Sequence, residues 1–169
     1  MKNKRNIVIA VTLVVFAGFF LRAILQKEET IQEGKLVLLR LAPVDPRSLI
    51  QGDYMQLNYA INDELRETTL NKEEIHKRGY VILTLDEQNR GTFKAISTAL
   101  PKLEKEDAIV AVKYFNWDGF SLAVGAESYF FQEGKDTLYE QAKYGGLRVD
   151  QNGNSVLVGL YTENLERIE

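Results

Sequence analysis

The chain has 169 residues, 45% of them hydrophobic and 27% charged, which is the size of one globular domain with a short additional segment. The formal net charge is −3, but residues 1–25 hold four of the 21 basic residues and none of the 24 acidic ones, so the remainder is distinctly acidic. An acidic body without a basic patch argues against nucleic acid as a partner. The absence of cysteine excludes disulfides, thiolate metal sites and a cysteine nucleophile.

The first predicted element is a transmembrane helix over Ile7–Leu25, which reads IVIAVTLVVFAGFFLRAIL. A helix of this length spans about 28 Å, close to the hydrocarbon thickness of a bilayer, and Arg22 lies near its far end, where the guanidinium can reach the interface. Basic residues precede it and two glutamates follow it soon after, so the N-terminus is expected in the cytoplasm. No small-x-small cleavage site follows the run. We therefore expect an uncleaved signal-anchor, with a cleaved signal peptide as the alternative.

Two strands are expected next, separated by a break. Pro43 and Pro46 interrupt the backbone because proline lacks an amide donor and restrains the residue before it. From residue 54 to 61 polar and apolar residues alternate, which predicts a strand with one buried face. The expected order is a polar connector Glu28–Gly34, a buried strand Lys35–Ala42, a helical turn Arg47–Gln51 and a strand Tyr54–Ile61.

The rest of the chain predicts hairpins and two short helices. Asn71 and Glu74 form a capping box for one helix, which Gly79 would end, and the Asn152-Gly153 pair is a strong hairpin signal. The expected strands are Tyr80–Leu85, Thr92–Thr98, Ala108–Phe115, Phe120–Val124, Glu127–Phe131, Leu147–Asp150 and Ser155–Tyr161, with the second helix over Gly134–Tyr144, ended by Gly145 and Gly146.

These elements predict an α+β fold: a mostly antiparallel sheet with two short helices, preceded by one N-terminal transmembrane helix. A doubly wound parallel sheet is not expected, because the strands come in hairpin pairs. We expect residues 1–27 to form the cytoplasmic tail and the signal-anchor, and residues 28–169 to form one domain outside the cytoplasm.

Residues 52–59 spell GDYMQLNY, which matches every fixed position of the motif that names the GDYXXLXY domain family of bacterial membrane-anchored proteins. The upstream PVDPR (residues 43–47) and the downstream ESYFF (residues 127–131) with Glu133-Gly134 also resemble that family. The resemblance covers nearly the whole exported region. It implies a single-span protein at the cytoplasmic membrane whose partner is an integral membrane protein, and it implies no reaction.

The motif suggests a set of candidate residues with two open interpretations. The block is either a corner that defines the fold, with glycine and aspartates in tight turns, or a surface that contacts a ligand or partner. The candidates are Asp45, Arg47, Gly52, Asp53, Tyr54, Leu57, Tyr59, Glu127, Tyr129 and Glu133.

The sequence supports a catalytic function less well than a binding function. Ser48 lacks the upstream pattern of a Ser–Lys protease, and His76, the one histidine, falls in a charged segment expected to be an exposed helix. Asp45, Asp53, Glu127 and Glu133 would suit a calcium site if they converged. Asp53 with Glu127 or Glu133 would suit a carboxylate hydrolase. An aromatic groove for sugar or peptide is a further possibility, from Tyr114, Phe115, Trp117, Phe120, Tyr129, Phe130 and Phe131.

The sequence therefore predicts a membrane-tethered extracytoplasmic accessory or binding domain. The expected contacts are the lipid bilayer through Ile7–Leu25 and an integral membrane protein, with no cofactor and no metal. The alternatives are a cell-envelope hydrolase or carbohydrate-active enzyme that uses carboxylates, and a ligand sensor.

Overall fold

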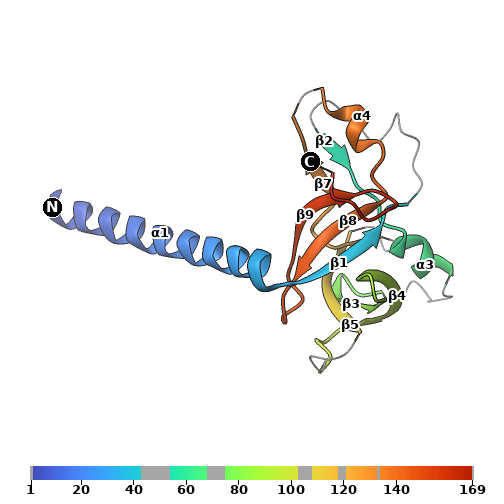
Figure 1. Cartoon of the computed structure of the whole chain (residues 1–169). Helices are drawn as coiled ribbons and strands as arrows, with labels where there is room; N and C mark the ends of the chain where they lie inside the picture. Colours follow the sequence, from blue (N-terminus) through green and yellow to red (C-terminus); the bar gives the residue numbers. More distant parts are fainter. Residues whose placement is uncertain are drawn as a thin grey trace.

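The computed structural model describes residues 2–42, 54–67, 75–102, 108–117, 121–132 and 134–168. Within these ranges the chain forms a long helix, two short helices and nine strands (Figure 1). In chain order they are α1 (Lys2–Glu33), β1 (Lys35–Arg40), β2 (Tyr54–Gln56), α3 (Ile61–Glu67), β3 (Arg78–Leu85), β4 (Arg90–Ser97), β5 (Ile109–Asn116), β6 (Leu122–Ala123), β7 (Ser128–Phe130), α4 (Asp136–Tyr139), β8 (Tyr144–Val149) and β9 (Ser155–Tyr161).

Helix α1 projects away from the strands as a single rod (Figure 1). It contains the expected apolar run and is long and apolar enough to cross a membrane, and none of its apolar window is buried inside the protein. The expected polar connector Glu28–Gly34 is wrong, because the helix continues to Glu33. Glutamate and glutamine favour helix, and Gln32 donates a 2.6 Å hydrogen bond to Glu28 one turn earlier.

The domain is built on a seven-stranded sheet with the order β6-β5-β3-β4-β1-β8-β9. All neighbouring pairs are antiparallel except β1 and β4, which pair in parallel at Leu38–Arg90 and Leu39–Gly91. The predicted α+β class with a mostly antiparallel sheet is confirmed.

The sheet curls until its two ends approach each other. The Lys113 amide donates to the Gly153 carbonyl oxygen at 2.8 Å, and the Ser155 hydroxyl donates to the Val124 carbonyl oxygen at 2.6 Å. The β8–β9 hairpin therefore reaches back to β5 and to the residue after β6. The concave side holds the hydrophobic core, which includes Val37, Leu39, Val81, Leu83, Val112, Leu147 and Leu160.

Strands β2 and β7 form a separate antiparallel pair beside the larger sheet. The expected alternation from residue 54 to 61 is confirmed, since Met55, Leu57, Tyr59 and Ile61 are all buried. The expected single strand is too long. It ends at Gln56, because β7 offers partners only through Ser128, and α3 begins at Ile61.

Two glycine signals mark strands and not helix ends, which corrects two expectations. Gly79 lies inside β3, where a Cβ would stand 2.9 Å from the Tyr114 hydroxyl oxygen. Gly145 and Gly146 lie inside β8. A Cβ on Gly145 would stand 2.9 Å from the Tyr59 ring, and one on Gly146 would overlap the Tyr161 ring, so these glycines make room for tyrosines.

The remaining helix expectations have mixed outcomes. The helix expected over Gly134–Tyr144 shrinks to α4, because the chain must reach β8 already extended at Tyr144. His76 is exposed, but it lies in an irregular segment before β3 and not in a helix. The expected helical turn Arg47–Gln51 and the capping box at Asn71 lie outside the described residues.

Candidate functional site

Tyr59 is held inside the domain by its hydroxyl group and its ring. The side chain is 2% exposed, and its hydroxyl donates a 2.6 Å hydrogen bond to the Ala126 carbonyl oxygen. Burial raises the pKa of Tyr59 well above its usual range, and the nearby Glu127 carboxylate raises it further. Tyr59 is therefore a neutral donor that joins the end of the motif to the segment before β7.

The backbone around Tyr59 is tied to two other segments. The Leu57 amide donates to the Glu127 carbonyl oxygen at 2.8 Å, and the Ala42 amide donates to the Asn58 carbonyl oxygen at the same distance. Tyr59 itself pairs with Leu41 in an isolated antiparallel bridge. The second half of GDYMQLNY thus crosses between the end of β1 and the start of the ESYFF segment.

Glu127 uses its side chain in a local turn. Its Oε1 atom accepts a 3.0 Å hydrogen bond from the Gly125 amide, and Gly125 has φ of 78°, a left-handed conformation that suits glycine. Within the described ranges no group of three or more His, Cys, Asp or Glu side chains is placed to hold a metal ion. Glu127 is thus positioned as a turn residue in this corner.

Tyr54 and Phe130 face each other across the two-stranded sheet. They are register partners in β2 and β7, with ring centroids 5.8 Å apart. Phe130 is 75% exposed, and Tyr54 is half-buried. Another molecule can reach this aromatic pair, as it can the exposed side chains of Gln56 and Asn58 in the same motif.

Tyr129 points to the opposite face of β7, toward the core. Its ring lies 5.2 Å from the Tyr139 ring, which in turn lies 5.0 Å from the Phe131 ring. Burial, together with a hydrogen bond to Tyr139, raises the pKa of Tyr129 to about 12, although the positive charge of Arg167 opposes the shift. The three rings attach α4 to the β2–β7 pair.

The candidate residues thus separate into two groups. Leu57 and Tyr59 are each 2% exposed and serve the corner, whereas Tyr54, Glu127 and Tyr129 are half-buried. The other candidates, Asp45, Arg47, Gly52, Asp53 and Glu133, lie outside the described residues. Convergence of Asp53 or Glu133 with Glu127 therefore stays a prediction.

The junction between α1 and the domain was missed by sequence reasoning. Gly34 follows the helix directly, and a Cβ there would overlap the Thr30 carbonyl oxygen and stand 3.0 Å from the Val149 amide. Arg148 donates to the Gly34 carbonyl oxygen at 2.8 Å, and Lys27 donates to the Ser155 carbonyl oxygen at 3.2 Å. A glycine between a helix-forming run and a strand was the available signal.

Asp150 completes this junction. Its carboxylate accepts hydrogen bonds from the amides of Asn152 and Asn154, each at 2.8 Å, and from the Asn154 side chain at 2.7 Å. The hydroxyl of Thr30, a residue only 2% exposed, lies 3.4 Å from the same carboxylate. The last turn of α1 therefore packs against the Asn-Gly hairpin, and the helix leads into β1 without a flexible linker.

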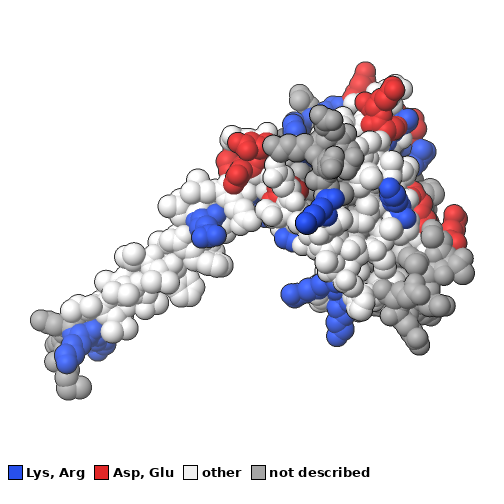
Figure 2. Space-filling view, turned by 90° about the horizontal axis from the view of Figure 1, so that it is seen from below, with Lys and Arg blue, Asp and Glu red and all other residues white. Residues whose placement is uncertain are grey.

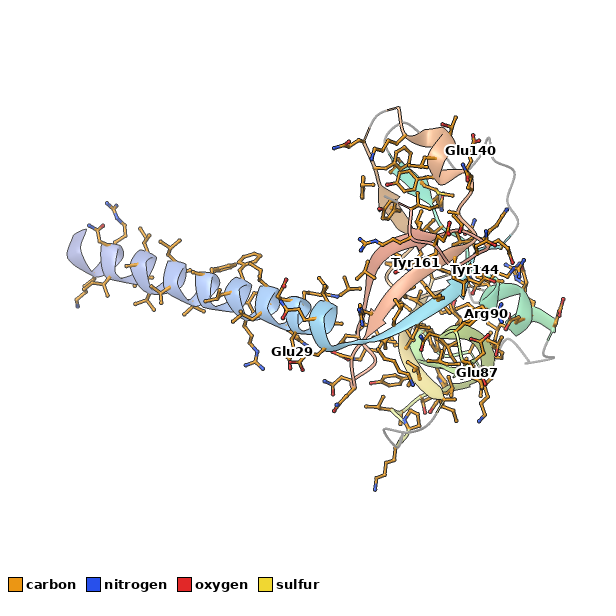
Figure 3. All side chains as sticks on the ribbon, in the orientation of Figure 1. Glu29, Glu87, Arg90, Glu140, Tyr144 and Tyr161 are labelled. Carbon is orange, nitrogen blue, oxygen red and sulfur yellow. The ribbon has the colours of Figure 1, made fainter. Side chains whose placement is uncertain are left out.

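A second cluster missed by sequence reasoning surrounds Tyr144, which Figure 3 labels with Tyr161 and Arg90. Tyr144 hydrogen-bonds Arg90, and the Arg40 guanidinium lies 5.9 Å from the Tyr144 ring centre. Asp86 accepts from Arg90 at 2.6 Å, and hydrogen bonds from Arg90 hold the pKa of Asp86 below its usual range. Each arginine has an acidic partner, since Arg40 lies 3.7 Å from Glu163.

These features define a class of protein: a curled α+β domain continuous with one apolar helix that is able to cross a membrane. The family model described as "GDYXXLXY protein" matches residues 16–160, which is most of the chain. The chain therefore belongs to the GDYXXLXY family. The match includes the half of α1 that adjoins the domain, and the junction. Neither the comparison with curated proteins nor the comparison with solved structures found a match.

Proposed function

We propose that this chain is a membrane-tethered accessory or binding domain, with its N-terminus in the cytoplasm and its sheet outside. The carrying observation is that the apolar run of α1 is fully exposed while its last turn is bound to the domain. Figure 2 shows an uncharged stretch of the helix between basic groups near its free end and one basic group closer to the domain. Exposure of such a large apolar surface to water is unfavourable, whereas a bilayer covers it.

The direction of insertion follows from the flanking charges. Lys4 and Arg5 precede the run, and Glu28 and Glu29 follow it, so the positive-inside rule places the domain outside. The cysteine-free chain permits a clean test. Lys4→Cys and Lys94→Cys each introduce one exposed thiol, one on either side of the helix.

In intact spheroplasts, a membrane-impermeant maleimide is expected to label the thiol of Lys94→Cys directly and that of Lys4→Cys only after permeabilisation. The reverse pattern would overturn the topology. Equal labelling of both without permeabilisation, or recovery of the chain in the soluble fraction, would overturn the membrane tether itself.

The proposed partner is an integral membrane protein. A tether holds the domain at one bilayer, so proteins in that bilayer meet it at a high effective concentration. The domain also offers exposed aromatic groups of the kind enriched at interfaces. Trp117 is 83% exposed and lies 4.3 Å from the Phe115 ring, over which Arg78 is placed at 5.4 Å.

Site-specific photo-crosslinking tests this partner. A photoreactive residue at Trp117 or Phe130 is expected to capture a protein with several membrane spans, whereas the same group at exposed Lys94 should capture much less. Adducts formed only between copies of the chain, or equal capture from all three positions, would contradict the proposal.

A further inference from the structure

A groove of about 1300 Å3 lies between α1 and the underside of the domain. One wall is a single face of the helix, from Gly18 to Glu33. The other is formed by residues 100–102 after β4, residues 109–111 of β5 and residues 149–152 of the β8–β9 hairpin. Since Gly18 belongs to the predicted membrane span, the groove extends from the outer part of the span to the base of the domain. A membrane lipid is therefore the neighbour that the groove would meet first.

The helix wall changes character in a definite order. Gly18, Leu21 and Leu25 are uncharged, Arg22 lies at the outer end of the span, and Glu29 follows seven residues later, about 10 Å further from the bilayer. Residues spaced by three, four and seven positions share one helix face, so these groups line the groove together. From the membrane outward the wall presents Gly18 and Leu21, then Arg22, then Leu25 and Gln26, and then Glu29, so the cationic group precedes the anionic one.

Four of the charged groups that line the groove are not used by the fold. Within the ranges that the structure describes, Arg22, Glu29, Glu33 and Lys102 have no hydrogen bond or ion pair to another described side chain, although all four line the groove. Asp150, which also lines it, is already occupied by its hairpin and Thr30. Two cations and two anions are thus available to a ligand.

We propose that this groove binds a phospholipid with a primary ammonium headgroup. The acyl chain lies along Gly18 and Leu21, the phosphate meets Arg22 and Lys102, and the ammonium meets Glu29. The inference rests on the proposed membrane topology and goes beyond it. The order of groups in such a lipid, from acyl chain to phosphate to ammonium, matches the order of Leu21, Arg22 and Glu29 along α1.

The same chemistry selects among lipids. A primary ammonium donates charge-assisted hydrogen bonds to carboxylates, whereas the quaternary ammonium of a choline lipid has no N–H to donate. A glycerol headgroup carries no cation for Glu29 and adds a net negative charge near Glu33. The groove should therefore prefer ethanolamine lipids over both.

The test uses the full-length protein reconstituted into nanodiscs that contain phosphatidylethanolamine, phosphatidylcholine and phosphatidylglycerol in equal parts. After release in mild detergent, native mass spectrometry reports which lipids remain bound. The wild-type chain is expected to retain the ethanolamine lipid about threefold over the choline lipid, the scale of one exposed charge-assisted contact.

Matched variants assign the contacts. Glu29→Gln should abolish the preference for ethanolamine, while Glu28→Gln, which alters the adjacent helix face, should preserve it. Arg22→Gln should lower retention of all three lipids, Arg22→Lys should restore part of it, and Lys102→Gln should have a larger effect than Lys94→Gln.

Equal retention of the three lipids by the wild-type chain would overturn the inference, and so would equal effects of Glu29→Gln and Glu28→Gln. Flotation of the same samples separates the two proposals. A chain that floats with the bilayer but shows no lipid preference retains the tether and loses the lipid site. A chain that does not float loses both.

Discussion

The Tyr59 hydroxyl and the Ala126 carbonyl oxygen lie 2.6 Å apart, although 67 positions separate the two residues in the chain. This bond joins the GDYMQLNY segment to the residue immediately before ESYFF. The Leu57–Glu127 backbone bond lies beside it. The two signatures are therefore the two sides of one corner, and the distance between them in sequence hides a direct contact in space.

Loss of the Tyr59 hydroxyl should destabilise this corner. Tyr59→Phe leaves the buried Ala126 carbonyl oxygen without this donor, and we expect the free energy of unfolding to fall by about 1–2 kcal/mol. Urea unfolding of the detergent-solubilised chain measures the change. Tyr161→Phe, at a half-buried tyrosine of β9 whose hydroxyl makes no hydrogen bond to another described residue, should change the value by less than about 0.5 kcal/mol. Equal effects of the two substitutions would argue against the corner.

Alkaline pH should weaken the domain through its buried tyrosines. Tyr129 has its pKa raised to about 12 from 10.0, and the pKa of Tyr59 is raised too, so the folded chain holds protons that the unfolded chain releases. Their contribution is fully present below pH 10.0 and is lost as pH rises toward the folded values. Unfolding free energies measured across this interval should fall, and less steeply in Tyr129→Phe. An unchanged slope in that variant would refute the assignment.

The helix–sheet junction should not accept a side chain at Gly34. Its Cβ would meet the backbone at Thr30 and Val149, which cannot move without shifting the helix or β8, so we expect Gly34→Ala to cost about 1–3 kcal/mol. Limited proteolysis near residue 34 and the unfolding midpoint report the change. Gly18→Ala is the matched control, since nothing lies within 4 Å of a Cβ there. A junction as protease-resistant as the wild type would show that the close approach is not required.

Asp150 should stabilise the hairpin that receives the helix. Asp150→Ala removes the acceptor for the amides of Asn152 and Asn154, and a loss of about 1–2 kcal/mol is expected. Hydrogen exchange of the Asn154 amide provides the local measurement, which should become faster. Gln151→Ala, at the exposed neighbouring position, should leave that exchange rate unchanged. A similar acceleration in both variants would remove the special role of the carboxylate.

Patterns that depend on neighbours in the chain were sufficient to predict much of the fold. The apolar run predicts α1, the alternation at residues 54–61 predicts which side chains are buried, and Asn152-Gly153 predicts the β8–β9 hairpin. Such signals work because helix and strand periodicity and turn chemistry are properties of a few consecutive residues.

The role of three glycines could not be predicted, because it depends on residues that are distant in the chain. Gly79, Gly145 and Gly146 have the sequence signature of helix ends, yet each lies in a strand beside a tyrosine ring that comes from elsewhere in the chain. A backbone preference is local, but the space that a missing side chain leaves is filled by whatever residue folds against it. The residues next to the glycine in the sequence do not identify that partner.

The sequence by itself determined the class of the domain, the apolar helix and the family resemblance, because these follow from composition, periodicity and a contiguous motif. The tertiary structure alone decided that Tyr59 faces Ala126, that α1 enters the sheet without a linker, and that Arg22 shares a groove with Lys102. The physical reason is that these contacts join residues 67 or more positions apart, and chain reversal through the curled sheet, not local preference, brings such residues together.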